Sequence, residues 1–147
     1  MPTFWCPYCW QETAAETKQC PNCGADFARY SHLPYEEKLL LALRHPVAER
    51  RMIAIEALGR IGYAPAVSAL ARLLHEESDP YLLRAAIVAL SQIDTPAARA
   101  LIEQATRHVN MLVRHAAEDV LLYRSEAPPC SADVEGGGAA EDRSGRG

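Results

Sequence analysis

Residues 50–74, RRMIAIEALGRIGYAPAVSALARLL, decide the fold of this 147-residue chain. Apolar residues in the first half recur at i, i+3, i+4 and i+7, as they do on one face of an α-helix. These residues are Ala54, Ala57, Leu58 and Ile61. The sequence Gly-Tyr-Ala-Pro at 62–65 interrupts the pattern, and a second apolar face follows at Ala69, Leu70 and Leu73. The stretch therefore predicts two amphipathic helices joined by a short turn.

The same pattern returns further along the chain. The four apolar positions of the first helix recur 32 residues later as Ala86, Ala89, Leu90 and Ile93. The second helix recurs only in part, at an offset of 31, where Ala100 and Leu101 match Ala69 and Leu70. A third copy of the first helix follows at an offset of 30, beginning near Val113. A repeat of this length predicts stacked, antiparallel helix pairs.

Helix start signals agree with this division. Asp79 and Thr95 each precede a proline, and an N-cap residue followed by proline is a typical helix start. Asn110 is the expected cap of the last helix. The predicted helices cover 35–44, 47–61, 65–76, 80–93, 96–108 and 111–123. The predicted fold class is mostly α, a short α-solenoid of helix pairs preceded by a small cysteine-rich segment.

Composition divides the chain into three parts. Residues 1–34 are rich in Cys, Pro and aromatic residues and lack a helical period, whereas residues 35–124 are almost entirely amphipathic helix. Residues 125–147 contain Pro-Pro, Gly-Gly-Gly and a single large aliphatic residue, Val134. Such a segment buries too little apolar surface to offset its ordering entropy, so we expect a disordered tail.

Four cysteines in the first part have the spacing of a metal site. They form Cys6-Pro-Tyr-Cys9 and Cys20-Pro-Asn-Cys23, and Gly24 follows the second pair. Each C-x-x-C turn can direct two thiolates at one ion, and zinc favours a tetrahedral set of four. Iron and a redox-active pair are the alternatives, and a redox pair would need a βαβ context. The fifth cysteine, Cys130, lies in the tail, where we expect a free thiol.

The cysteine pattern resembles a zinc ribbon of the bacterial CPxC…CPxCG type, over residues 4–27. Trp10 departs from that pattern, because glycine is common at its position. The resemblance implies one structural zinc ion and short β-hairpins. It also implies that Phe4, Trp5, Trp10 and Phe27 pack around the site.

The helical part is similar to HEAT repeats, specifically the short HEAT-like kind found in phycobilisome lyases. The resemblance rests on residues 50–74 and on LRAAIVALSQIDTPAARALI at 83–102. Some HEAT-like proteins are enzymes. The repeats of deoxyhypusine hydroxylase are similar and hold iron through several His-Glu pairs, but here only His75-Glu76 matches. Bilin lyases share the repeat as well, but a shared fold does not transfer an activity. We therefore expect a protein that is not an enzyme.

Charge and hydropathy restrict the partners. The net charge is −4, and residues 35–124 carry eleven basic and eleven acidic side chains, so no segment has the basic excess typical of nucleic-acid binding. The apolar stretches are far shorter than the roughly 20 residues that span a bilayer. No signal peptide is visible. We therefore expect a cytoplasmic protein, and closely spaced cysteines in that reducing compartment hold metal more often than they form disulfides.

These observations favour a non-catalytic interaction scaffold whose partner is another protein. The alternative is an accessory subunit or chaperone to an enzyme reaction, as in a bilin-lyase-like protein. In HEAT-like stacks the second helix of each pair lines the concave side, which predicts a partner surface at Arg72, Arg99, Glu103 and Arg107. The last helix lacks a mate, so Leu121 and Leu122 form a second candidate, for a partner or a homodimer. The ribbon replaces a missing first helix, and we expect it to cap the stack.

Overall fold

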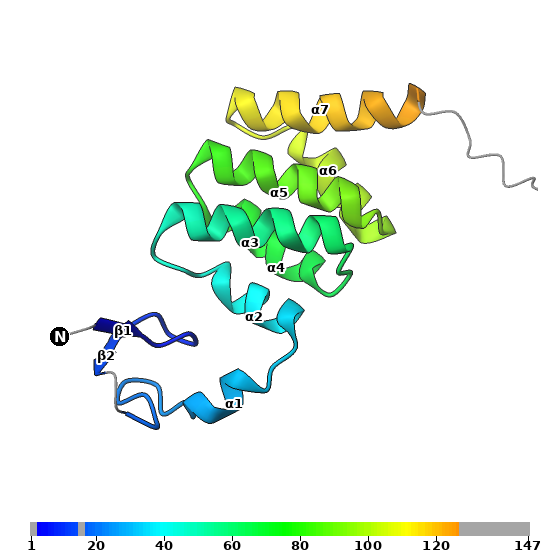
Figure 1. The fold of residues 1–147 in the computed structure, drawn as a ribbon. Coiled ribbons are helices and arrows are strands. Elements are labelled where there is room, and N and C mark those ends of the chain that lie inside the picture. Colours follow the sequence, from blue (N-terminus) through cyan, green and yellow to red (C-terminus); the bar gives the residue numbers. More distant parts are fainter. Residues whose placement is uncertain (1–2, 15–16, 127–147) are drawn as a thin grey trace, which may run out of the picture.

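The computed structural model of the chain describes residues 3–14 and 17–126. Within these residues the chain forms two short strands followed by seven helices (Figure 1). The strands are β1 (Thr3–Trp5) and β2 (Glu12–Ala14). The helices are α1 (Phe27–Ser31), α2 (Tyr35–Ala42), α3 (Ala48–Ile61), α4 (Ala66–Glu76), α5 (Pro80–Ile93), α6 (Pro96–Ala105) and α7 (Met111–Glu126).

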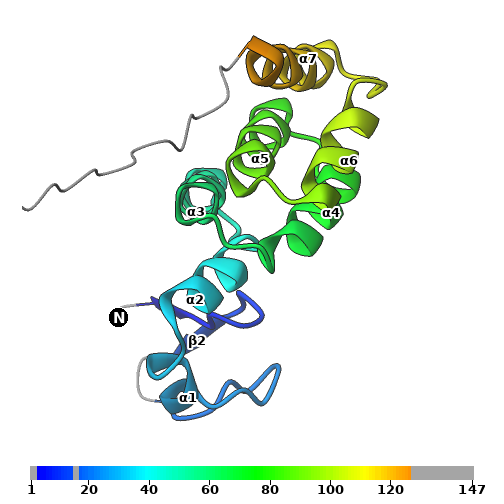
Figure 2. The same ribbon diagram turned by 90° about the vertical axis from the view of Figure 1, so that its right-hand side faces the viewer.

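The helices form two layers, as the repeat predicts. Helices α3, α5 and α7 stack side by side in one layer, whereas α4 and α6 lie behind them in a second layer (Figures 1 and 2). Helix α2 packs on α3 at the N-terminal end of the stack, next to the two strands. The expected α-solenoid of helix pairs with a small N-terminal segment is therefore confirmed.

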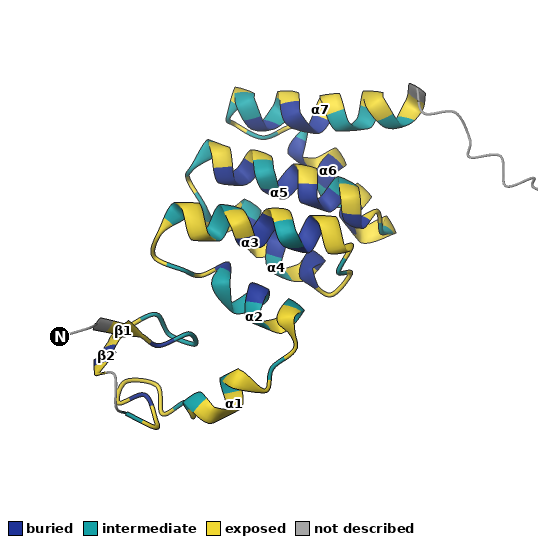
Figure 3. Cartoon of the chain, in the orientation of Figure 1, coloured by how far each residue is buried: buried dark blue, intermediate teal, exposed yellow. Residues whose placement is uncertain are grey.

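One apolar core runs through the stack from α2 to α7 (Figure 3). Each of the two predicted faces supplies buried residues, among them Leu58 and Leu90 from the first helices and Leu70 and Ile102 from the second. Ile61 differs from its repeat partner Ile93, because it is 45% exposed whereas Ile93 is 8% exposed. The helix end does not account for this difference, because each isoleucine is the last residue of its helix and is followed by a left-handed residue, Gly62 or Asp94.

Small residues let α3 and α5 approach closely. A Cβ atom built on Gly59 would lie 2.8 Å from the Cα of Ala89, closer than such atoms ever approach. Glycine at this position and alanine opposite it are therefore required by the packing of the two helices.

The predicted caps are confirmed. The side chains of Asp79, Thr95 and Asn110 accept hydrogen bonds from the backbone N–H groups of Tyr81, Ala98 and Leu112. These bonds satisfy donors that the first helical turn leaves without partners.

Several helix boundaries differ from the prediction. Helix α2 ends at Ala42 and α6 at Ala105, two and three residues early, because the chain tightens into i→i−3 turns there. His45 N–H donates to Ala42 O and His108 N–H to Ala105 O. Helix α7 continues to Glu126, two residues into the segment expected to be a tail. The rest of that segment, with Cys130, lies outside the described residues.

The sequence analysis missed α1, whose five residues are too few to show a helical period. The side chain of Asp26 caps it by accepting a hydrogen bond from Ala28 N–H. Among the described helices, none is long and apolar enough to cross a membrane.

Candidate metal centre and interaction surfaces

The two cysteine turns have the same backbone structure. In the first, Cys6 N–H donates to Gln11 O and Trp10 N–H to Cys6 O, at 2.9 and 2.8 Å. In the second, Cys20 N–H donates to Ala25 O and Gly24 N–H to Cys20 O, both at 2.9 Å. The first turn connects β1 to β2, which pair in antiparallel register with Phe4 opposite Thr13. The expected hairpin is therefore present and carries half of the cysteine cluster.

Each turn places the residue after its second cysteine in the left-handed region. Gly24 has φ = 73° and Trp10 has φ = 58°. Glycine adopts this conformation without cost, but for a residue with a side chain it costs about 1–2 kcal/mol. The departure from the ribbon pattern at Trp10 is therefore a strained position, and contacts between its indole and the helical part offset the strain.

The four sulfur atoms form a compact group. All four Sγ atoms lie within 4.8 Å of one another. Two pairs across the turns, Cys6 with Cys23 and Cys9 with Cys20, are separated by 3.7 Å. A tetrahedral zinc ion with Zn–S bonds of about 2.3 Å requires sulfur atoms about 3.8 Å apart. The cysteine cluster, defined as Cys6, Cys9, Cys20 and Cys23, therefore fits a single tetrahedral metal ion.

The ionisation of the four cysteines also favours the binding of a cation. The Asn22 side chain donates a hydrogen bond to Cys9 Sγ and is the main reason that the pKa of Cys9 falls to about 6. The Ala25 N–H group favours the Cys23 thiolate, but desolvation and the three neighbouring thiols outweigh it and raise the pKa of Cys23 to about 12. Four crowded thiolates repel one another, and a divalent ion removes that repulsion.

The other two cysteines of the cluster show the same contrast. Burial raises the pKa of Cys6, which is fully buried. The backbone N–H of Cys23 donates to Cys20 and is the largest cause of the lowered pKa of Cys20. Backbone donors within each turn thus support the ionised sulfur that a metal requires.

The aromatic residues around the cluster do not form the compact core that the ribbon pattern implies. Phe4 and Trp5 are 53% and 49% exposed, so neither is buried in a ribbon core. They line an apolar pocket of about 450 Å³ together with Trp10, Phe27 and Tyr30. A three-residue strand in a two-stranded sheet has too few neighbours to cover such large side chains.

Trp10 instead joins the cluster to the helices. Its indole Nε1 donates a 3.0 Å hydrogen bond to Leu41 O in α2. Its ring lies 4.4 Å from the ring of His45, centroid to centroid. The sequence places Trp10 beside a ligand, but its distant partners could not be predicted.

The residues of the predicted concave surface lie in the second layer, three of them on its helices and one just after a helix end. Arg72 on α4 pairs with Glu76 at 3.7 Å, and Arg99 on α6 pairs with Asp94 at 3.0 Å. Glu103 is exposed on α6. Arg107 is exposed but follows the end of α6, so its predicted place on that helix is wrong. Two of the three cations in this group therefore already have acidic neighbours.

The C-terminal end of the stack is held at its last turn. Leu121 is partly buried against the core, whereas Leu122 is 62% exposed. Arg124 bonds to Asp94 at 2.5 Å and also donates to Ser91 O at the end of α5. The Arg99 and Arg124 side chains hold the pKa of Asp94 below its usual range, with the Arg124 hydrogen bond the larger cause. The exposed apolar surface at this end is confined to a few side chains.

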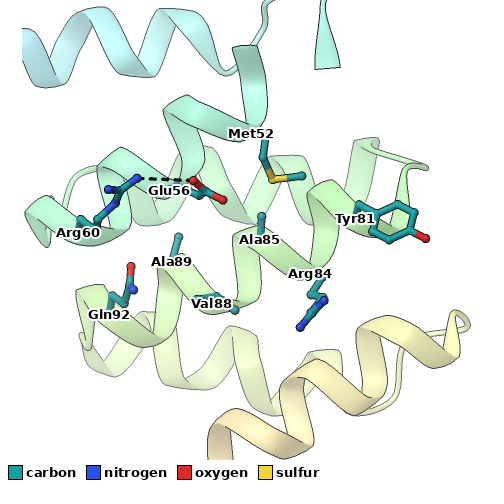
Figure 4. A pocket seen from close by; sticks show the side chains of 9 residues that line it. All are labelled: Met52, Glu56, Arg60, Tyr81, Arg84, Ala85, Val88, Ala89 and Gln92. Carbon is teal, nitrogen blue, oxygen red and sulfur yellow. Dashed lines mark ion pairs between the residues drawn. The ribbon is translucent and has the colours of Figure 1, made fainter. Parts of the chain in front are cut away.

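A surface that the sequence analysis missed lies along the stacked first helices. A groove of about 460 Å³ runs between α3 and α5 (Figure 4). Its lining combines apolar side chains, including Met52 and Val88, with the Glu56–Arg60 ion pair and Arg84. The small Ala85 and Ala89 leave the space that forms it. The repeat alignment marks Ala89 as a packing residue, but it does not show that a groove lies beside it.

Comparison with known families identifies the helical part. A family model for HEAT repeats matches residues 36–122, which include every helix from α2 to the last turns of α7. The match covers more than half of the chain, and the cysteine cluster lies outside it. A comparison with curated proteins finds no match.

Proposed function

Because the chain belongs to the HEAT-repeat family, we propose that it is a non-catalytic scaffold that binds other proteins and carries one structural zinc ion. HEAT stacks present long helical faces, and their ordinary use is to bind protein partners. The observation that carries the scaffold proposal is the open groove between α3 and α5, where apolar and charged side chains occur together. Such a mixture is typical of protein interfaces.

Zinc is the proposed ion because the cluster offers four thiolates in a closed set. Structural zinc sites have four protein ligands and leave no position for substrate. When bound, zinc would cross-link the two turns and organise a segment too small for a core of its own. Thiolate-held zinc suits a reducing compartment, and we therefore also infer a cytoplasmic location.

We further propose three domains: a ribbon at 1–34, the repeats at 35–124 and a tail at 125–147. The hydrogen bond from Trp10 to Leu41 supports a ribbon that caps the stack. Removing residues 1–33 should lower the thermal stability of the helices. An unchanged unfolding temperature would mean that the ribbon is an independent unit on a linker.

Elemental analysis of the purified full chain tests the zinc proposal. We expect one zinc ion per chain, and we expect Cys20→Ser to lose it because an incomplete site binds weakly. Cys130→Ser, outside the cluster, is the matched control and should keep the metal. A wild-type protein without zinc, or full occupancy in Cys20→Ser, would contradict the proposal.

Affinity capture from the native host tests the scaffold proposal with three charge variants. Val88→Glu places a charge in the groove between α3 and α5, and Leu122→Glu places one on the exposed face of α7. The double variant Arg72→Glu, Arg107→Glu reverses two charges on the predicted concave surface. The variant that abolishes capture of the wild-type partner identifies the surface. Arg29→Glu, exposed on α1, is the control.

Sedimentation of the same proteins tests the proposed homodimer through α7, which Leu122→Glu should dissociate. Added DNA or RNA should cause no shift. A bound tetrapyrrole with its own absorbance band would favour the accessory-subunit alternative. If no variant changes capture and the protein stays monomeric, the three surfaces are wrong.

A further inference from the structure

The first cysteine turn contacts helix α2 through two separate routes. Trp10 follows the ligand Cys9 directly, and its indole reaches Leu41 in the last turns of α2. Tyr8 lies between the two ligands of this turn and packs edge-on against Tyr30, with ring centroids 6.0 Å apart. Both residues are therefore positioned by the same two cysteines.

The second route continues from Tyr30 to α2. The ammonium group of Lys38 lies 5.4 Å from the centroid of the Tyr30 ring and donates a 3.2 Å hydrogen bond to Ser31 O. Lys38 occupies the middle of α2, whereas Leu41 lies near its end. The ribbon thus contacts both the middle and the end of this helix.

Helix α2 depends on such contacts more than the other repeat helices do. With eight residues it is the shortest of helices α2 to α7, and like α3 and α4 it has no side-chain cap at its N-terminus. An isolated helix of this length is unstable in water. In the core it is anchored by Leu39 and Leu43, which are buried, and by Leu40 and Ala42, which are partly buried against them.

A bound metal would add a cross-link to the first turn, which strand pairing and backbone hydrogen bonds also support. Phe4 and Trp5 are half exposed, so the hairpin has little apolar core to fix the turn without the ion. Trp10 also has a strained backbone at φ = 58°, and this strain would favour release of the turn once the cross-link is lost. Loss of the ion would therefore release both Tyr8 and Trp10 from their places.

We propose that metal occupancy of the cysteine cluster controls the order of helix α2 through Trp10 and Tyr8. This inference rests on the proposed metal binding. Helix α2 supplies one wall of a second groove of about 340 Å³, with α4 on the other side. Leu40 on α2 and Arg44 just after it line one side of this groove, and Arg72 on α4 lines the other. Metal release would loosen the α2 side and change this surface while the α3–α5 groove is unaffected.

Hydrogen exchange of the full chain, loaded with zinc and then treated with a chelator, tests the coupling. We expect the amides of α2 to exchange roughly fivefold faster or more after zinc removal, the factor that corresponds to one hydrogen bond. Amides of α5 are the internal reference and should not change. Unchanged α2 exchange, or an equal loss in α5, would overturn the proposal.

Two variants separate the coupling from metal binding itself. Trp10→Phe should retain zinc but speed α2 exchange roughly fivefold, because the phenyl ring cannot donate to Leu41. Trp5→Phe, the matched control, should leave α2 unchanged. Lys38→Met breaks the second route from the helix side without touching a cysteine, and it too should speed α2 exchange with zinc bound.

The outcomes distinguish the two proposals. A wild-type chain that binds no zinc refutes the zinc proposal. A chain that binds zinc, and whose α2 protection is the same in wild type, Trp10→Phe and Lys38→Met, refutes only the coupling.

Discussion

Replacing Gly59 by alanine tests the close packing of α3 and α5. The new Cβ would lie 2.8 Å from Ala89 Cα and 2.9 Å from Ala89 Cβ, whereas ordinary separations are 3.4 Å or longer. The third neighbour, Gln92 Oε1 at 2.5 Å, is on a flexible side chain and can move away, but the α5 backbone cannot. The two helices must therefore separate by roughly half an ångström or more.

The expected loss of stability combines two opposing effects. Overpacking costs about 1–3 kcal/mol, and the better helix propensity of alanine returns up to about 1 kcal/mol. We expect Gly59→Ala to be destabilised by about 1–2 kcal/mol, which corresponds to a fall in Tm of roughly 4–16 °C for a domain of this size.

Thermal unfolding followed by circular dichroism measures this loss. Ser68→Ala, at an exposed position of α4, is the control and should change Tm little. Adding Ala89→Gly removes the methyl group at position 89, so the double variant should lose less stability than the sum of the two single substitutions. A Tm for Gly59→Ala equal to or above wild type would refute the close approach of the two helices.

Three further predictions concern charges and the metal. Burial, together with the nearby cations Arg50 and Arg51, lowers the pKa of His45, so the unfolded chain binds the proton first and stability should fall as pH drops below about 6.5. His45→Asn, which can still accept the Val47 N–H, should show a smaller fall in Tm between pH 7.5 and 5.5. Arg124→Gln should lower the free energy of unfolding by up to about 1 kcal/mol and speed hydrogen exchange in the last turn of α7. Unchanged exchange there would mean that the Arg124–Asp94 ion pair does not hold this turn. Zinc affinity, measured by competition with a coloured chelator, should fall as pH falls because the metal must displace thiol protons, and a flat profile would argue against thiolate ligands.

The sequence by itself determined the elements and the cysteine cluster, because both depend on local spacing. Apolar periodicity and caps such as Asp79 located the long helices, and the two C-x-x-C turns located four cysteines whose sulfurs lie within 4.8 Å of one another. Boundaries were less accurate where the last turn tightens, as at Ala105, because i→i−3 turns leave no mark in the apolar pattern.

Only the tertiary structure decided which surfaces meet. The left-handed Trp10 looks like a departure from a glycine position until its indole is seen to bond Leu41, 31 residues away. The groove between α3 and α5 likewise depends on how closely Gly59 approaches Ala89, a distance between helices that no periodicity encodes. Spacing along the chain specifies which face of an element is apolar, whereas contacts between distant elements depend on side-chain volumes that are matched only when the chain is folded.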